Sequence, residues 1–128
     1  MKNPTAEELL DGILARDPRY TVEAYAFVRG GLDFTVRRLK KPRHVSGQEL
    51  LEGIREFAIE EFGPMTKTVL NGWGISCTED IGEIVFNMVE TGLLGKTEED
   101  SRADFANGYD FDEAFRKPFR PNPVRAKA

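Results

Sequence analysis

The sequence has very few of the residues that form covalent cross-links or tight metal sites. Among its 128 residues there is one cysteine, Cys77, and one histidine, His44. A single cysteine excludes a disulfide within the chain, and one cysteine with one histidine cannot supply the ligands of a zinc site. The Gly-rich phosphate loops of the Rossmann and Walker types are also missing. We therefore expect no bound metal and no cofactor.

Long apolar runs and an excess of positive charge are missing as well. No apolar run approaches the roughly 18 residues that a membrane-spanning helix needs, and residues 1–4 lack the apolar core of a signal peptide. The formal net charge is −4, which disfavours a general nucleic-acid binder because neutralising phosphates requires clustered lysine and arginine. These features predict a cytoplasmic protein that makes no membrane contact.

What the sequence does contain is a series of capped amphipathic helices. Thr5 with Glu8 forms a capping box, and apolar residues follow at helical spacing to residue 14. A longer helix is expected from Thr21 to about Lys40. Ser46 with a glutamate three residues later opens another helix.

The expected helix of residues 21–40 carries apolar side chains on two faces. Phe27 and Phe34 line one face, and the opposite face carries Tyr25, Val28, Leu32, Val36 and Leu39. Gly30 and Gly31 lie in its middle, at a cost of about 1 kcal/mol each relative to alanine. We expect a second backbone to approach this helix closely at the glycines.

The stretch "GWGISCTEDIGEIVFNMVETGLL", residues 72–94, resembles the second half of a helix-turn-helix. An apolar repeat from Met65 to Trp73 precedes it, and we expect Trp73 to be largely buried. A helix capped by Ser76 or Thr78 then runs to Thr91. Beyond it the periodicity fades. The Asn-Gly pair at residues 107–108 favours either a small β-hairpin, forming a wing, or two short helical turns.

Together these patterns predict a mostly α protein forming one compact domain. Residues 1–45 would form an N-terminal helical hairpin and a basic loop. Residues 46–115 would form a tri-helical, winged-helix-like unit on which the hairpin packs. Residues 116–128, with three prolines and five basic residues but no acid, would form a flexible basic tail.

Three stretches carry a resemblance to a known family: "DPRYTVEAYAFV", "RHVSGQELLEGIREFAIEEFGPM" and "DIGEIVFNMVETGLLGKTEEDSRADFANGYDFDEAF". They are similar to an uncharacterised bacterial family named after a hypothetical protein of a methane-oxidising acidophile. The resemblance covers roughly residues 5 to 120. It implies a small cytosolic bacterial protein, and it assigns no catalytic residues.

The expected helix of residues 78–91 is a candidate binding surface. Its outward arc carries four acidic residues and no basic one, so major-groove binding would set carboxylates against phosphates. Sequence-specific DNA binding is therefore disfavoured. Phe86 falls at the rim of this arc, near Glu83 and Glu90. An aromatic ring among carboxylates suits a basic, apolar segment of a partner protein. The alternative is that Phe86 packs against the wing or the tail.

The run "RRLKKPRH" is the sharpest concentration of positive charge. It contributes Arg37, Arg38, Lys40, Lys41 and Arg43 without an acidic residue. A helix C-terminus accounts for two or three of these charges, since cations stabilise that end of the helix dipole. RNA phosphates or an acidic protein could contact the rest, with help from the tail.

Cys77 is the remaining chemical candidate, because a helix N-terminus favours the thiolate form. No general base lies beside it in sequence, and only the fold could bring His44 near. The acidic residues around Gly108 do not match a calcium-binding EF-hand loop, because apolar residues occupy its ligand positions. We therefore expect a non-catalytic protein-interaction module, with RNA or ribosome association as the alternative and a small enzyme using Cys77 as a weaker one. The sequence does not indicate an oligomeric state.

Overall fold

Helices and short helical turns make up most of the described fold. The computed structural model describes residues 5–41, 43, 45–94, 102–106 and 108–119. Its helices are α1 (Ala6–Arg16), α2 (Val22–Arg37), α3 (Gly47–Phe62), α4 (Thr66–Gly72) and α5 (Thr78–Thr91). Shorter turns follow these helices: η1 (Gly63–Met65), η2 (Arg102–Phe105), η3 (Asp112–Arg116) and η4 (Lys117–Phe119). No strand occurs in these ranges, so the mostly α class is confirmed.

The helix ends follow the capping residues in most places. The Thr5 hydroxyl accepts a hydrogen bond from the Glu8 amide at 3.1 Å, and both bonds of the capping box at Ser46 are present. Helix α2 ends at Arg37, short of the expected Lys40. The Arg38 amide donates to Thr35 O, three residues back. The last turn therefore tightens, and the helix ends there.

Small residues allow α2 and α3 to pack very closely. A Cβ atom on Gly31 would lie 2.6 Å from Ile54 Cγ1, and one on Gly53 would lie 1.8 Å from Thr35 Oγ1. The Thr35 hydroxyl donates to the Gly31 carbonyl oxygen at 2.7 Å, so this buried polar group is satisfied within α2. The expected close approach to α2 is confirmed, and the approaching helix is α3.

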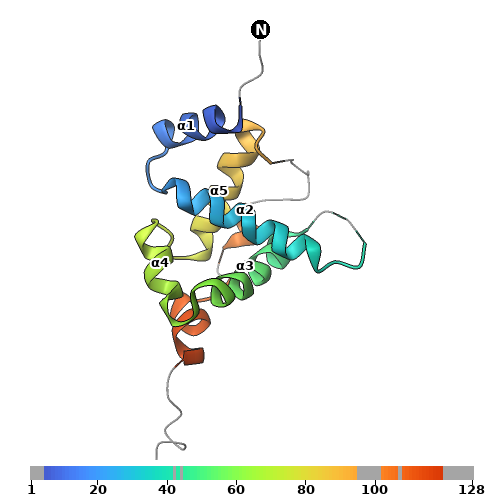
Figure 1. Cartoon of the computed structure of the whole chain (residues 1–128), viewed down its shortest axis with the longest axis vertical. Helices are drawn as coiled ribbons and strands as arrows, with labels where there is room; N and C mark the ends of the chain where they lie inside the picture. The colour runs from blue at the N-terminus through green and yellow to red at the C-terminus, as the bar shows by residue number, and fades with distance from the viewer. Residues whose placement is uncertain (1–4, 42, 44, 95–101, 107, 120–128) are drawn as a thin grey trace, which may run out of the picture.

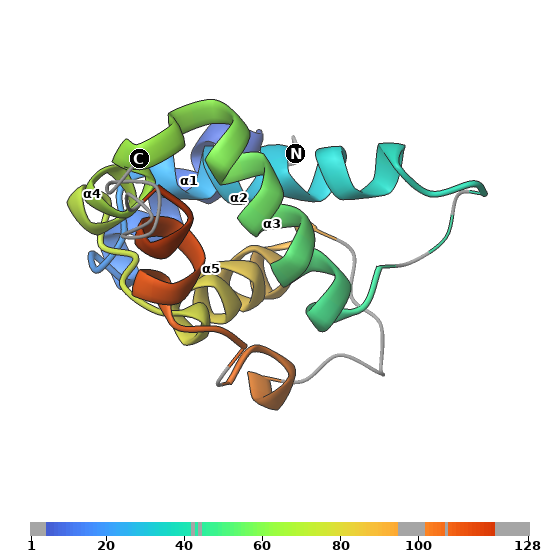
Figure 2. The ribbon, with the colours of Figure 1, turned by 90° about the horizontal axis from the view of Figure 1, so that it is seen from below.

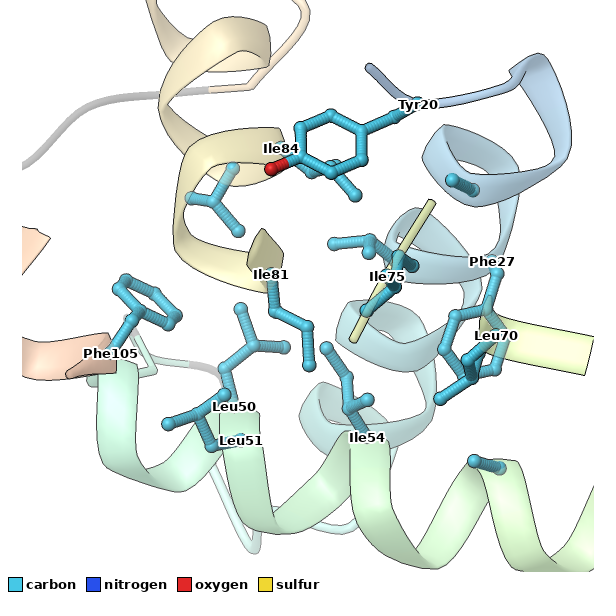
Figure 3. Packing of buried hydrophobic residues seen from close by; sticks show 14 of the residues in the cluster. Tyr20, Phe27, Leu50, Leu51, Ile54, Leu70, Ile75, Ile81, Ile84 and Phe105 are labelled. Atoms are coloured by element: carbon cyan, nitrogen blue, oxygen red, sulfur yellow. The ribbon is translucent and has the colours of Figure 1, made fainter. Parts of the chain in front are cut away.

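One hydrophobic core joins all five helices and the turns η2 and η3. Ile54, Leu70, Ile75, Ile81 and Ile84 are fully buried and meet near its centre (Figure 3). The second apolar face of α2 is covered by aromatic rings. Phe57 of α3 lies 5.4 Å from Phe27 and 5.4 Å from Phe34, centroid to centroid. Burial of α2 on two sides is thus confirmed.

The apolar repeat around α4 lies in a different register from the expected one. Residues 63–65 form a separate 3₁₀ turn, so Met65 points outward and is 56% exposed. Thr66 is buried instead, and its hydroxyl donates to the Ala58 and Gly63 carbonyl oxygens. Trp73 is partly buried and packs against the rings of Phe27 and Phe62.

Residues 102–106 and 108–119 contain helical turns that pack on the helices, η2 against α5 and α3, and η3 against α4 and α3 (Figure 2). Asn107 lies outside the described residues, while the segments on both sides of it are the turns η2 and η3. Of the two predicted structures, short helical turns and not a β-hairpin therefore describe these segments. The Gly108 amide donates to Thr78 Oγ1 at 3.0 Å, and a Cβ on Gly108 would lie 2.6 Å from Leu51 Cδ1. Helical structure continues to Phe119, past the expected start of the tail at residue 116.

Helix α1 lies at one end of the long axis and η4 at the other (Figure 1). The main contacts of α1 are with α5 rather than with α2. Ile13 is the one residue of α1 that is buried. The first two helices therefore make few contacts with each other, unlike the two helices of a tightly packed hairpin.

Candidate interaction surfaces

The aromatic and acidic side chains on the outer face of α5 contact the chain's own η2. The Arg102 guanidinium lies over the Phe86 ring, 5.2 Å from its centroid. Arg102 Nε donates to Glu83 Oε2 at 2.7 Å, and Arg102 Nη2 lies 3.7 Å from Glu90 Oε1. Phe105 meets the Phe86 ring edge to face at 6.1 Å. A basic, apolar segment of the kind expected at this surface is thus supplied by the same chain.

Buried contacts anchor η2 to α5. A Cβ atom on Gly82 would lie 2.7 Å from Phe105 Cβ, so the ring sits directly on the helix backbone. The Thr78 hydroxyl donates to the Phe105 carbonyl oxygen at 2.6 Å. Phe105 itself is only 2% exposed. The η2 turn is therefore an integral part of the core, and Phe86 contacts it, as the alternative for that residue predicts.

Asn87 is buried, although it lies on the same face of α5 as Glu83 and Glu90, four residues after the one and three before the other. Its Nδ2 donates to Asp17 Oδ2 and to Tyr25 Oη, both at 3.0 Å. Hydrogen bonds from Arg19 hold the pKa of Asp17 well below its usual range, and the bond from Asn87 lowers that pKa further. Arg19 also pairs with Glu83 at 3.2 Å. The partners of Asn87 come from α2 and from the turn before it, which spacing along α5 could not reveal.

Two of the five positive charges at residues 37–43 are paired with α3. Arg38 forms an ion pair with Glu56, and Arg43 Nη2 lies 2.6 Å from Glu49 Oε2. Hydrogen bonding to Arg43, with that from the Ser46 amide, lowers the pKa of Glu49 to about 2.

The other three positive charges stay at the surface. Arg37 is exposed, and its Nε donates to the Asp33 carbonyl oxygen. Lys40 and Lys41 are also exposed. The positive field of this region is therefore weaker than the sequence suggests.

Cys77 is the N-cap of α5, and its thiol lies 3.4 Å from Asp80 Oδ2. Burial raises the pKa of the Cys77 thiol, and the neighbouring Asp80 carboxylate raises it further. Neither Ser76 nor Thr78 caps α5, because the N-cap is Cys77 and no side chain accepts a cap hydrogen bond there. The Asp80 carboxylate instead accepts from the Ser76 amide at 2.9 Å, just outside the helix. Asp80 also accepts from the Tyr20 hydroxyl at 2.5 Å. His44 lies outside the described residues, and a raised thiol pKa is the opposite of what a cysteine nucleophile needs.

A third surface, not foreseen from the sequence, is a groove of about 280 Å³ between α1 and α2. We call it the α1–α2 groove. Its lining is mostly apolar: Ala6, Leu10, Val22, Tyr25, Ala26, Met88 and Leu93, with Glu7 and Arg29 as the charged members. Tyr25 and Met88 are buried and form its floor, while Val22 is 45% exposed. The groove exists because α1 rests on α5 and leaves this part of α2 uncovered.

The described residues contain neither a cluster suited to a metal ion nor a helix able to span a membrane. No group of three or more histidine, cysteine, aspartate or glutamate side chains in these ranges could hold a metal ion. None of the described helices is both long and apolar enough to cross a membrane.

Comparison with known proteins adds no family to this geometry. No family model, no curated protein and no solved structure matches the chain. The surfaces of the protein are therefore what points to a function.

Proposed function

We propose that this chain is a non-catalytic protein-interaction module of the bacterial cytoplasm, and that it binds a segment of a partner protein in the α1–α2 groove. The observation that carries the proposal is the apolar lining of this groove together with the exposure of Val22. Apolar side chains that cluster on an otherwise charged surface commonly mark a place where another molecule is bound.

The size and lining of the groove favour a protein segment over a small ligand. Its volume of about 280 Å³ lies just below the roughly 300–1,000 Å³ typical of small-molecule sites. Val22, Tyr25, Ala26 and Arg29 follow the i, i+3, i+4, i+7 spacing of one helix face. Val22 and Ala26 are exposed and Tyr25 is buried at the floor, so this face of α2 suits the apolar face of a second helix.

We also propose that α3, α4 and α5 form a winged-helix-like unit that does not bind DNA. The outer face of α5 carries Glu79, Glu83 and Glu90. Glu83 and Glu90 pair with Arg102, and the Arg102 guanidinium covers Phe86. A partner at Phe86 would have to displace Arg102, so the groove is the better docking surface.

RNA or ribosome association remains the second candidate. Lys40 and Lys41 are exposed, and Arg37 contacts only a backbone oxygen of its own helix among the interactions described. Three such charges support weak, salt-sensitive binding to phosphates. RNA binding through these charges would leave the α1–α2 groove without a role, so a protein partner is the better proposal.

Affinity capture from a native lysate tests the proposal with two matched variants. Val22→Arg places a long charged side chain in the groove, and Met65→Arg makes the same change at an exposed apolar residue far from it. We expect nuclease-treated lysate to yield the same captured proteins with the wild type and Met65→Arg, and to lose them with Val22→Arg. Capture that is unchanged by Val22→Arg would contradict the proposal. Capture that disappears on nuclease treatment would favour the RNA alternative.

A further inference from the structure

The exposed side of α1, which borders the α1–α2 groove, carries a row of carboxylates. Glu7, Glu8 and Asp11 are all exposed. Glu7 lines the groove, and Asp11 lies one helical turn further along the same face. In the part of the chain that the structure describes, none of the three takes part in an ion pair. Arg16, the basic residue of the last turn of α1, lies instead 4.0 Å from Glu90 of α5.

The opposite wall of the groove carries a single positive charge that has a contact of its own. Arg29 Nη1 donates to the Leu93 carbonyl oxygen at 3.4 Å. The groove therefore has an apolar floor, Glu7 on the α1 side and Arg29 on the α2 side. Glu8 and Asp11 extend the negative charge along the exposed side of α1, outside the lining itself. An occupant that matched this pattern would carry positive charge along the edge facing α1.

We propose that the occupant of the α1–α2 groove is an amphipathic helix of a partner protein whose apolar face is flanked by lysine or arginine on the side that lies against α1. This inference rests on the proposed function, because it names the chemistry of the partner at the same site. The lining residues of α2 run from Val22 to Arg29, which spans about 10 Å at 1.5 Å per residue. Two turns of a partner helix fit that length.

Two synthetic helical peptides with the same leucine face test the charge requirement. One carries lysine at the flanking positions and the other carries glutamate, and fluorescence anisotropy measures their binding to the full chain. We expect the lysine peptide to bind about tenfold more tightly at low salt, since each exposed charge contributes modestly. Raising the salt from about 0.1 M to about 1 M shortens the Debye length from about 10 Å to about 3 Å and should remove most of that preference.

Variants of the protein show which residues are responsible for the preference for the lysine peptide. The double variant Glu7→Gln, Asp11→Asn should reduce the preference for the lysine peptide. Glu60→Gln, Glu61→Gln, which neutralises two exposed acids of α3, should leave that preference unchanged. Val22→Arg should weaken binding of both peptides.

Three other results would contradict the proposal, each in a different way. If both peptides bind equally and Val22→Arg weakens both, the groove binds apolar helices and the inference about charge is wrong. If neither peptide binds, or if Val22→Arg affects neither, both this inference and the groove as a docking surface are wrong. If the control double variant lowers the preference as much as Glu7→Gln, Asp11→Asn does, the attraction comes from net charge and not from α1.

Discussion

Single residues set the distance between α2 and α3. Gly31, Gly53 and Thr35 form the contact, and the Thr35 hydroxyl is tied to the Gly31 carbonyl oxygen. A side chain added at either glycine would have to push the two helices apart or force Thr35 to rotate. The close packing of α2 and α3 therefore requires that Gly31 and Gly53 have no Cβ atom. For α2 the sequence indicates this requirement, because two glycines lie in the middle of the helix.

Gly53→Ala should destabilise the protein although alanine is the better helix former. The new Cβ would lie 1.8 Å from Thr35 Oγ1, and overpacking of this kind costs about 1–3 kcal/mol. Gly12→Ala is the matched control, because nothing lies within 4 Å of its Cβ position. That variant should gain up to about 1 kcal/mol from helix propensity. Urea unfolding measures both, and a Gly53→Ala variant as stable as the wild type would contradict the close packing.

Asp17 should make stability depend on pH in the acid range. Its folded-state pKa is lowered by Arg19 and Asn87, so its contribution is present above its unfolded pKa of about 3.9 and is lost as the pH falls below that value. Asp17→Asn should cost about 1–3 kcal/mol at neutral pH and flatten the pH dependence between about pH 5 and pH 2. Thermal unfolding of both proteins across this range is the measurement. Parallel curves for the two would show that Asp17 is not the group responsible.

Cys77 should react slowly with alkylating reagents at neutral pH. Burial and Asp80 raise its pKa, so little thiolate is present, and the thiolate is the reactive form. Mass spectrometry after iodoacetamide treatment should show slow labelling of the folded protein and fast labelling in denaturant. Rapid, stoichiometric labelling of the folded protein would revive the enzyme hypothesis for Cys77.

At the scale of elements, capping residues predict where most helices begin. Ser46 and Thr5 cap as expected. Helix α5 runs from Thr78 to Thr91 as expected, but neither Ser76 nor Thr78 caps it. The errors arise where short turns interrupt a helical repeat. The 3₁₀ turn of residues 63–65 rotates Met65 outward, and no periodicity argument could show that rotation.

The η2 turn contributes to stability mainly through Phe105. Phe105→Ala removes a buried ring and should cost about 3–5 kcal/mol. Phe86→Ala removes a half-buried ring and one cation–π contact with Arg102, and should cost about 1–2 kcal/mol. Chemical denaturation compares the two variants. If Phe86→Ala were the more damaging, η2 would not be anchored as described.

At the scale of the whole molecule, the sequence predicts the helical class and a two-sided α2, but not the α1–α2 groove. The groove depends on how α1 lies relative to α2 and α5, and the spacing of residues within one helix carries no information about that. Val22 and Ala26 belong to neither apolar row that the sequence shows on α2. Likewise, the contacts of Phe86, Glu83 and Glu90 with Arg102 join segments whose pairing only the fold reveals.

The central claim is that a protein partner occupies the α1–α2 groove in the cell. Site-specific photo-crosslinking tests it most directly, with a photoreactive amino acid placed at Val22 or, as the control, at Met65. Both side chains are exposed, at 45% and 56%, so both probes reach their surroundings. We predict a discrete, nuclease-resistant protein adduct from position 22 and none from position 65. Equal adducts from both positions, or none from position 22, would contradict the claim.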